Sequence, residues 1–330
     1  MKSLPALALF LAIPAAGPAF AAPPAPPAAG EEAVSVAERL SGIERIMWER
    51  DARSIPALRK QASKDPDEKV RARAIGALTL LRDTGKPMVY LERLSSDPSP
   101  RVRRAAADAI GTLGIQPDRI DRLSGPLRKD ADSMVRAECA RAIGRLGSRA
   151  AVGILIYAVS VDPSPEVRSL AAEALSRLGA TEAEPTLATS ARQDRSPAVR
   201  AQAVRALALI SPISSRGLFL TLWKDPAADA DVRLEAYRAL LQSTEEDRWV
   251  EEGLVSAEVP IRFLALRTWF SRLMFRSPGY RPLRSSAEVV RLGNFLKDSV
   301  RGIREFSRQS LEELGYKMRP DGFAYTIDDR

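Results

Sequence analysis

Apolar residues recur along this chain with a short spacing of four residues inside a long period of about 32. In five stretches an aspartate is followed five residues later by valine and then arginine, as in Asp97-Pro-Ser-Pro-Arg-Val102-Arg103. The valines of these stretches lie 32, 33, 32 and 32 residues apart, at Val70, Val102, Val135, Val167 and Val199. Weaker copies at Val232, Ile261 and Ile303 bring the number of units to eight. A period of this length is typical of stacked structural repeats.

Each unit predicts a helix that starts just before the valine. The fourth residue after the valine is small and the eighth is large and apolar, so both lie on one helical face. The small positions are Ala74, Ala106, Cys139, Ala171, Ala203, Ala236, Ala265 and Ser307. The large positions are Leu78, Ile110, Ile143, Leu175, Leu207, Leu240, Trp269 and Leu311. Large side chains fill a core and small ones let a neighbouring helix approach, so the pattern favours helices stacked side by side.

The ends of these helices are also marked. Three residues before the valine stands a side chain suited to accept N–H groups at a helix start, at Asp67, Ser99, Asp132, Ser164, Ser196 and Asp229. Glycines suited to a left-handed helix end follow a leucine at Gly114, Gly147, Gly179 and Gly315. Shorter amphipathic stretches at residues 54–64, 88–95, 150–160 and 217–224 predict a second helix in each unit. The expected fold is all-α, a right-handed superhelical α-solenoid of about eight two-helix units.

The aspartate and arginine of the repeat are expected to serve the structure. Each aspartate falls in a loop between helices, and the arginine after each valine falls in the first turn of the next helix. We expect a ladder of charge-assisted hydrogen bonds that fixes the angle between units. In the sixth and seventh units Ala227 and Ser256 occupy the acidic position. That change predicts loss of the ladder's acid and looser stacking from there on.

The first 21 residues are typical of a secretory signal peptide. Lys2 precedes an apolar run at residues 4–16, and small residues follow up to Ala21. The run is shorter than the ~20 apolar residues of a membrane span. We therefore expect a periplasmic or secreted protein. After the signal peptide (1–21) we expect a Pro/Ala-rich linker (22–30), an N-terminal capping helix (31–50), regular repeats (51–244), an irregular C-terminal set of repeats (245–318) and a polar tail (319–330).

The frame D-P-x-P-x-V-R-x-x-A-x-x-A-L-x-x-L-G resembles the HEAT repeat, specifically the short variety named after phycobilisome lyases. The resemblance covers residues 51–315 and is strongest over 65–210. It implies a helical solenoid and says little about activity. It also implies two enzymatic precedents, bilin attachment and the di-iron hydroxylation of deoxyhypusine, whose family places His-Glu pairs on its repeats.

Composition argues against an enzyme. The 330 residues include no histidine, so the di-iron ligands have no counterpart, and His-dependent nucleophile systems and His-based zinc sites are excluded as well. Bilin attachment is not expected either, because an exported protein does not meet the phycobiliproteins of cytoplasm or stroma. We therefore expect no enzymatic activity, no catalytic residue, no metal site, no cofactor and no small-molecule substrate.

Three further motifs have simple structural explanations. Asp83-Thr84-Gly85 spells the aspartic-protease triplet but occurs once, so we expect a loop at a helix end. The acids Asp225, Asp229, Asp231 and Glu235 lack the glycine and spacing of a calcium loop, and a role at a helix N-terminus explains them. Cys139, the single cysteine, stands where other units have alanine, which predicts a buried core residue.

The candidate binding surface is a set of arginines six or ten residues after the valine, here called the arginine stripe. Its members are Arg141, Arg145, Arg177, Arg205, Arg238 and Arg267. The second helices of stacked repeats usually line the concave face, so we expect the stripe in a groove. The chain would then be a scaffold that binds an acidic segment of a partner protein through paired Arg–carboxylate contacts. A solvated face without a ligand is the alternative.

The C-terminal repeats differ in charge. Of 50 basic and 42 acidic residues, residues 259–319 hold 13 and 5, a net of +8 that equals the charge of the whole chain. Aromatic residues lie among these arginines, at Phe263, Trp269, Phe270, Phe275 and Tyr280. The region could bind an anionic envelope surface or polymer, and export argues against nucleic acid. The alternative is a terminal cap whose aromatics form a core and whose arginines keep the outer face soluble.

Overall fold

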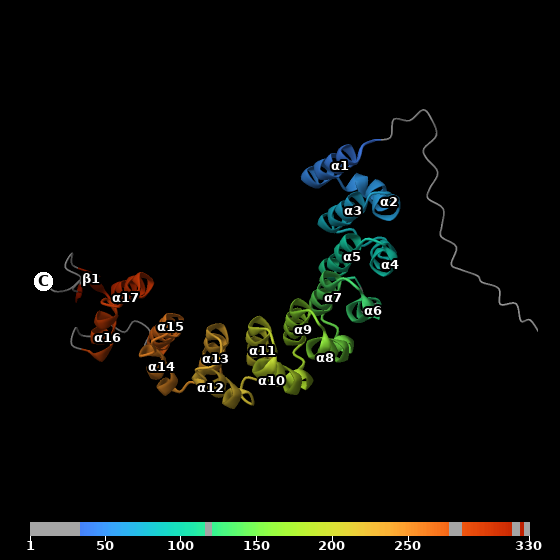
Figure 1. The fold of residues 1–330 in the computed structure, drawn as a ribbon. Coiled ribbons are helices and arrows are strands. Elements are labelled where there is room, and N and C mark those ends of the chain that lie inside the picture. Colours follow the sequence, from blue (N-terminus) through green and yellow to red (C-terminus); the bar gives the residue numbers. More distant parts are fainter. Residues whose placement is uncertain (1–33, 116–120, 277–285, 319–323, 327–330) are drawn as a thin grey trace, which may run out of the picture.

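The computed structural model describes residues 34–115, 121–276, 286–318 and 324–326 as an arch of stacked helices (Figure 1). The helices are α1 (Val36–Glu49), α2 (Ile55–Lys64), α3 (Glu68–Leu80), α4 (Met88–Ser96), α5 (Pro100–Leu113), α6 (Asp121–Lys129), α7 (Ser133–Leu146), α8 (Val152–Val161), α9 (Pro165–Arg177), α10 (Glu184–Gln193), α11 (Pro197–Ile210), α12 (Arg216–Lys224), α13 (Ala230–Ser243), α14 (Asp247–Leu254), α15 (Val259–Arg276), α16 (Ala287–Phe295) and α17 (Arg301–Glu313). The proposed signal peptide and linker, residues 1–30, lie outside the described residues.

In the described part of the chain, α1 is followed by eight helix pairs, from α2/α3 to α16/α17. The odd-numbered helices line the inner side of the arch and the even-numbered helices form its outer layer (Figure 1). The expected all-α solenoid is confirmed. None of the described helices combines the length and the apolar character needed to cross a membrane.

The C-terminal end departs from the expected polar tail. Strand β1 (Tyr316–Met318) pairs antiparallel with β2 (Ala324–Thr326), so part of segment 319–330 is a strand. The hairpin lies against α17, and Tyr316 is buried there. The last helix of a stack has one uncovered side, and the hairpin protects part of it.

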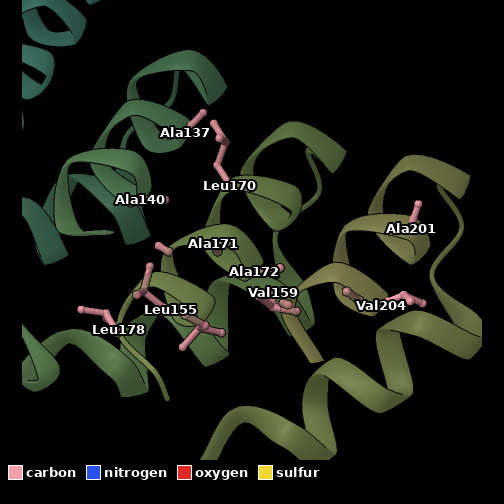
Figure 2. Close-up of a cluster of buried hydrophobic side chains, with 14 of the residues drawn as sticks. Ala137, Ala140, Leu155, Val159, Leu170, Ala171, Ala172, Leu178, Ala201 and Val204 are labelled. Carbon is pink, nitrogen blue, oxygen red and sulfur yellow. The ribbon is translucent and has the colours of Figure 1, made fainter. Parts of the chain in front are cut away.

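One continuous core runs through the stack. All eight small positions are buried, and of the eight large positions only Trp269 is partly exposed. Figure 2 shows how the units share this core: side chains from α7, α8, α9 and α11, such as Ala140, Leu155, Ala171 and Val204, lie in one cluster. Each helix pair therefore buries its second face only against its neighbours.

Two glycines that the repeat pattern did not single out lie directly against the backbone of a facing helix. A Cβ on Gly111 of α5 would lie 2.7 Å from Ala142 Cα of α7. A Cβ on Gly144 of α7 would lie 3.0 Å from Ala174 Cα of α9. Backbone carbon on the facing helix fills the space that a side chain would need, so α5, α7 and α9 pack tightly on the inner side of the arch.

The helices start at the predicted residues, but only some of these residues form the expected side-chain capping bonds. Asp67 and Asp132 accept two backbone N–H groups each, whereas Ser99, Ser164, Ser196 and Asp229 stand at the N-cap without a side-chain capping bond. After each of the three serines a proline presets the first helical turn. Asp229 instead pairs with Arg200. The four predicted glycines do adopt the left-handed conformation, with φ between 59° and 91°.

The expected ladder is present, and each rung joins two consecutive units. Arg71 donates from Nε and Nη2 to both carboxylate oxygens of Asp97, each at 2.9 Å. Its Nη1 donates to the carbonyls of Asp65 and Pro66 in its own loop. Asp97 also accepts the Ser99 amide at 3.0 Å. The same arrangement recurs at Arg103–Asp130, Arg136–Asp162 and Arg168–Asp194. It extends to Arg39–Asp65 at the N-terminal end.

The expected loss of the ladder's acid is wrong. Asp229 and Glu258, which stand two residues after Ala227 and Ser256, pair with Arg200 and Arg233. Asp298 then restores the original position and accepts Arg262 at 2.9 Å. An acid displaced by two residues toward the helix start therefore still reaches the guanidinium of the preceding unit. The ladder therefore continues through the last repeats.

The stacking of the inner helices nevertheless becomes looser toward the C-terminus. The cause is not loss of the ladder's acid. α13 lies less closely against α15 than α7 lies against α9. Between α15 and α17, Phe306 meets Phe263 and Phe270 edge-on, with ring centres 5.7 and 6.0 Å apart. Aromatic rings hold helices farther apart than alanine does.

Gly111→Ala should lower the stability of the stack, because the added methyl group overlaps the α7 backbone. We expect a loss of about 1–3 kcal/mol, the usual cost of overpacking a core. The matched control is Gly76→Ala in α3, where a Cβ meets nothing within 4 Å. That change should raise stability by up to about 1 kcal/mol through helix propensity. Urea midpoints of the two variants should move in opposite directions, and a shared direction would contradict the packing argument.

Asp97→Asn should destabilise the protein by about 3 kcal/mol at pH 7, because it leaves Arg71 buried without its counter-charge. Burial by itself raises the pKa of Asp97, but hydrogen bonds from Arg71 and the Ser99 amide outweigh it and hold that pKa below its ordinary value. The stabilisation is therefore complete above the unfolded pKa of about 4 and disappears as the pH falls through the lowered folded value. Urea titrations from pH 2 to 7 should show wild type and variant converging in acid.

The exposed acid Glu305, paired with Arg301, provides the control for that ladder variant. Glu305→Gln should not measurably shift the midpoint at any pH, since exposed pairs contribute little. Equal effects of the two substitutions would mean that the ladder is no more than a surface ion pair.

Candidate functional site

An open groove of about 970 Å³ lies among the described residues on the inner face of the arch. We call it the N-terminal groove. Helices α1, α3, α5 and α7 line it, and its residues are Leu40, Glu44, Lys69, Ala72, Arg73, Gly76, Pro100, Arg101, Arg104, Ala105, Asp108, Asp132, Met134, Glu138 and Arg141. Small side chains at Ala72, Gly76 and Ala105 keep it hollow. It exists because consecutive inner helices curve around it.

Most of the charged groups in the groove neutralise one another. Arg73 lies 3.2 Å from Glu44, and Arg141 lies 2.6 Å from Glu138. Asp132 is occupied at the start of α7, where it accepts the amides of Met134 and Val135. The two ion pairs therefore contribute no net charge to the groove, whereas Asp132 keeps its negative charge at the start of α7.

Three cations of the groove have no ion pair in the part of the chain that the structure describes. They are Lys69, Arg101 and Arg104, and all three are exposed. The sequence did not point to them because they stand one residue before or two residues after the valine. The arginine stripe was defined only from arginines six or ten residues after it. The lining of the groove shows that the inner face also includes these earlier positions.

Glu138 is the unusual acid of the groove. It is 5% exposed, and its Oε1 has no hydrogen-bond partner, although Arg145 Nη1 lies 3.8 Å away. Burial raises the pKa of Glu138 above its usual value, and the nearby positive charge of Arg141 only partly opposes this. Its environment is thus the reverse of that of Asp97, whose pKa is lowered.

The arginine stripe lies on the inner helices as expected, but its charge is largely compensated. The partners are Glu138 for Arg141, Asp108 for Arg145, Glu173 for Arg177, and Glu235 for both Arg205 and Arg238. Arg267 lies over the ring of Phe263, 5.9 Å from its centre. Acids on the same helix or on a neighbouring helix therefore neutralise most of the stripe.

The C-terminal basic region is also engaged in internal contacts. Arg272 donates to the carbonyls of Leu241 and Thr244, and Arg291 lies over the Trp269 ring, 5.1 Å from its centre. Phe275 is 85% exposed at the end of α15. Tyr280, Arg281 and Arg284 lie outside the described residues. This arrangement supports a terminal cap more than an anion-binding surface.

The remaining motifs have structural environments. Asp83 lies in the loop after α3, where it pairs with Arg59. The Cys139 side chain is buried, and burial raises the pKa of its thiol. Asp225, Asp229 and Glu235 bond to different partners. Across the described ranges, no three Asp, Glu or Cys side chains are grouped closely enough to hold a metal ion.

Comparison with known sequences agrees with the repeat frame. Residues 55–136 and 126–194 match the family of HEAT repeats. A curated relative is the HEAT repeat-containing taxis protein of Halobacterium salinarum, 36% identical over 150 residues, which are 40% of this chain and 36% of the relative. The chain thus spans about a third of the length of the curated relative that it matches.

Two solved structures superpose loosely on this chain. The complex of CpcE and CpcF of phycocyanin lyase from Nostoc sp. is 23% identical with a TM-score of 0.44, covering 69% of this chain and 94% of that one. A Kap121p mutant is 15% identical with a TM-score of 0.49, covering 84% of this chain and 36% of that one. The solenoid architecture of this chain accordingly rests on its own helix packing.

Glu138→Gln should leave the stability of the HEAT array unchanged or raise it by up to about 1 kcal/mol at pH 7. A raised folded pKa means that the ionised carboxylate is less favourable in the folded state than in the unfolded one. The two proteins should have the same stability near pH 4 and diverge as the pH rises through the raised pKa. Urea midpoints from pH 4 to 8 measure this, and a loss like that of Asp97→Asn would contradict it.

Proposed function

We propose that this chain is an exported HEAT-repeat scaffold that binds a partner protein on the concave face of its arch and has no enzymatic activity. The N-terminal groove is the observation that carries the proposal. It is wide and open, four helices contribute to it, and its charged groups are spread along it instead of meeting at one reactive point. Such a surface fits a polypeptide better than a small substrate, which is usually enclosed.

Export and the absence of catalysis rest on the sequence. Residues 1–21 have the pattern of a signal peptide, and a chain without histidine lacks the side chain most often used for acid–base catalysis. The Halobacterium relative is named as a taxis protein. From that likeness we propose for this chain only that its repeats support interaction with other proteins, and not a role in taxis.

The alternative, a peripheral binder of an anionic envelope surface, has less support. Of the C-terminal arginines, Arg262 is a ladder residue, Arg272 holds two carbonyls and Arg291 pairs with Glu251. Side chains used in this way have few donors left for a lipid or a polymer.

Site-specific photo-crosslinking in the native host tests the scaffold. A photoreactive residue at Gly76, which is exposed in the N-terminal groove, should capture a protein in the exported fraction. The same residue at Gly153 of α8, in the outer layer, should not; a Cβ meets nothing within 4 Å at either position. Equal capture at both positions, no capture at Gly76, or capture confined to the cytoplasm would overturn the proposal.

A further inference from the structure

Three unpaired cations give the N-terminal groove a preference for negatively charged ligands. Lys69, Arg101 and Arg104 lack an ion pair within the described ranges. Of the four acids in the lining, Glu44, Asp108 and Glu138 are paired with Arg73, Arg145 and Arg141, and Asp132 is bonded to the amides at the start of α7. We infer that this groove binds an extended acidic segment of the partner protein. The inference rests on the proposed function, since it specifies what the concave face takes.

The placement of two of these cations is unfavourable for the fold. Lys69 and Arg101 are each the second residue of their helices, α3 and α5. The N-terminal end of a helix carries partial positive charge, so a cation there destabilises the helix slightly. At α3 the acids Asp67 and Glu68 already offset this cost, whereas the first turn of α5 holds no acid. A carboxylate bound at Arg101 would interact favourably with both the side chain and the start of α5.

The size of the groove suits an extended chain. It runs across α1, α3, α5 and α7, which is three steps between neighbouring inner helices. At about 8–10 Å per step this is roughly 24–30 Å, or about eight residues of extended polypeptide. The small side chains Ala72, Gly76 and Ala105 allow a backbone to approach closely.

The chemistry of the lining favours carboxylates over nucleic acid. Two of the three free cations are arginines, whose planar forks match a carboxylate with two parallel hydrogen bonds. None of the lining residues is aromatic. Proteins that bind single-stranded nucleic acid generally stack bases on aromatic rings, and this groove offers none.

Fluorescence anisotropy with defined peptides tests the inference. The full chain is titrated against labelled peptides of about twelve residues that alternate alanine with Glu, Gln or Lys, in about 50 mM salt, where screening is modest. The Glu–Ala peptide should bind at least about tenfold more tightly than the Gln–Ala peptide, and high salt should weaken it. The double variant Arg101→Glu/Arg104→Glu should weaken its binding at least about tenfold, and Arg101→Gln/Arg104→Gln should weaken it less.

The matched control is Lys60→Glu/Lys64→Glu, which makes the same change in net charge on exposed residues of α2 in the outer layer. It should change affinity for the Glu–Ala peptide less than about twofold. An equal loss in both double variants would reduce the effect to overall charge and overturn the inference. Tightest binding of the Lys–Ala peptide, or of an oligothymidylate, would also overturn it.

The two proposals fail in different ways. If the Gly76 probe captures a protein and the Glu–Ala peptide does not bind, the acidic partner is wrong and the scaffold stands. If the Gly76 probe captures nothing, the scaffold itself is wrong. Circular dichroism of each double variant shows whether a loss of binding reflects loss of the helices.

Discussion

The fork between the arginine of one unit and the acid of the next is the interaction on which the rest of the structure depends. In the Arg71–Asp97 rung, the guanidinium donates two hydrogen bonds to the carboxylate of the next unit and others to the carbonyls of its own loop. The carboxylate also accepts a backbone amide at the start of the following helix. One ion pair therefore fixes a loop, a helix start and the relation between two units. Apolar packing is not directional, so the core alone would allow adjacent helix pairs to slide.

The repeated part of this structure could be predicted from sequence because its rules are local. A valine, a small residue and a large residue at fixed spacing determine one helical face, and a glycine determines where the helix ends. The continuation of the ladder could not be predicted in the same way. Asp229 and Glu258 both stand two residues from the expected place, and only the folded structure shows that they reach Arg200 and Arg233.

The binding face was predicted with the correct helices and the wrong charges. Counting arginines along one row ignored Glu138 and Glu235, which stand three residues before Arg141 and Arg238 on the same helix and neutralise them. Whether a cation is free depends on what neighbouring helices place beside it. For the same reason Lys69, Arg101 and Arg104 become noticeable only when α1, α3, α5 and α7 are assembled around a common hollow.

The closeness in sequence of all these contacts has a consequence for unfolding. The five N-terminal rungs join residues only 26 or 27 positions apart, and among the described residues no rung ties one end of the arch to the other. A linear array of this sort can fray from its termini while its middle stays intact. A polypeptide lying across four inner helices would be the one element that connects them at a distance, and those units would then open as a single cooperative block.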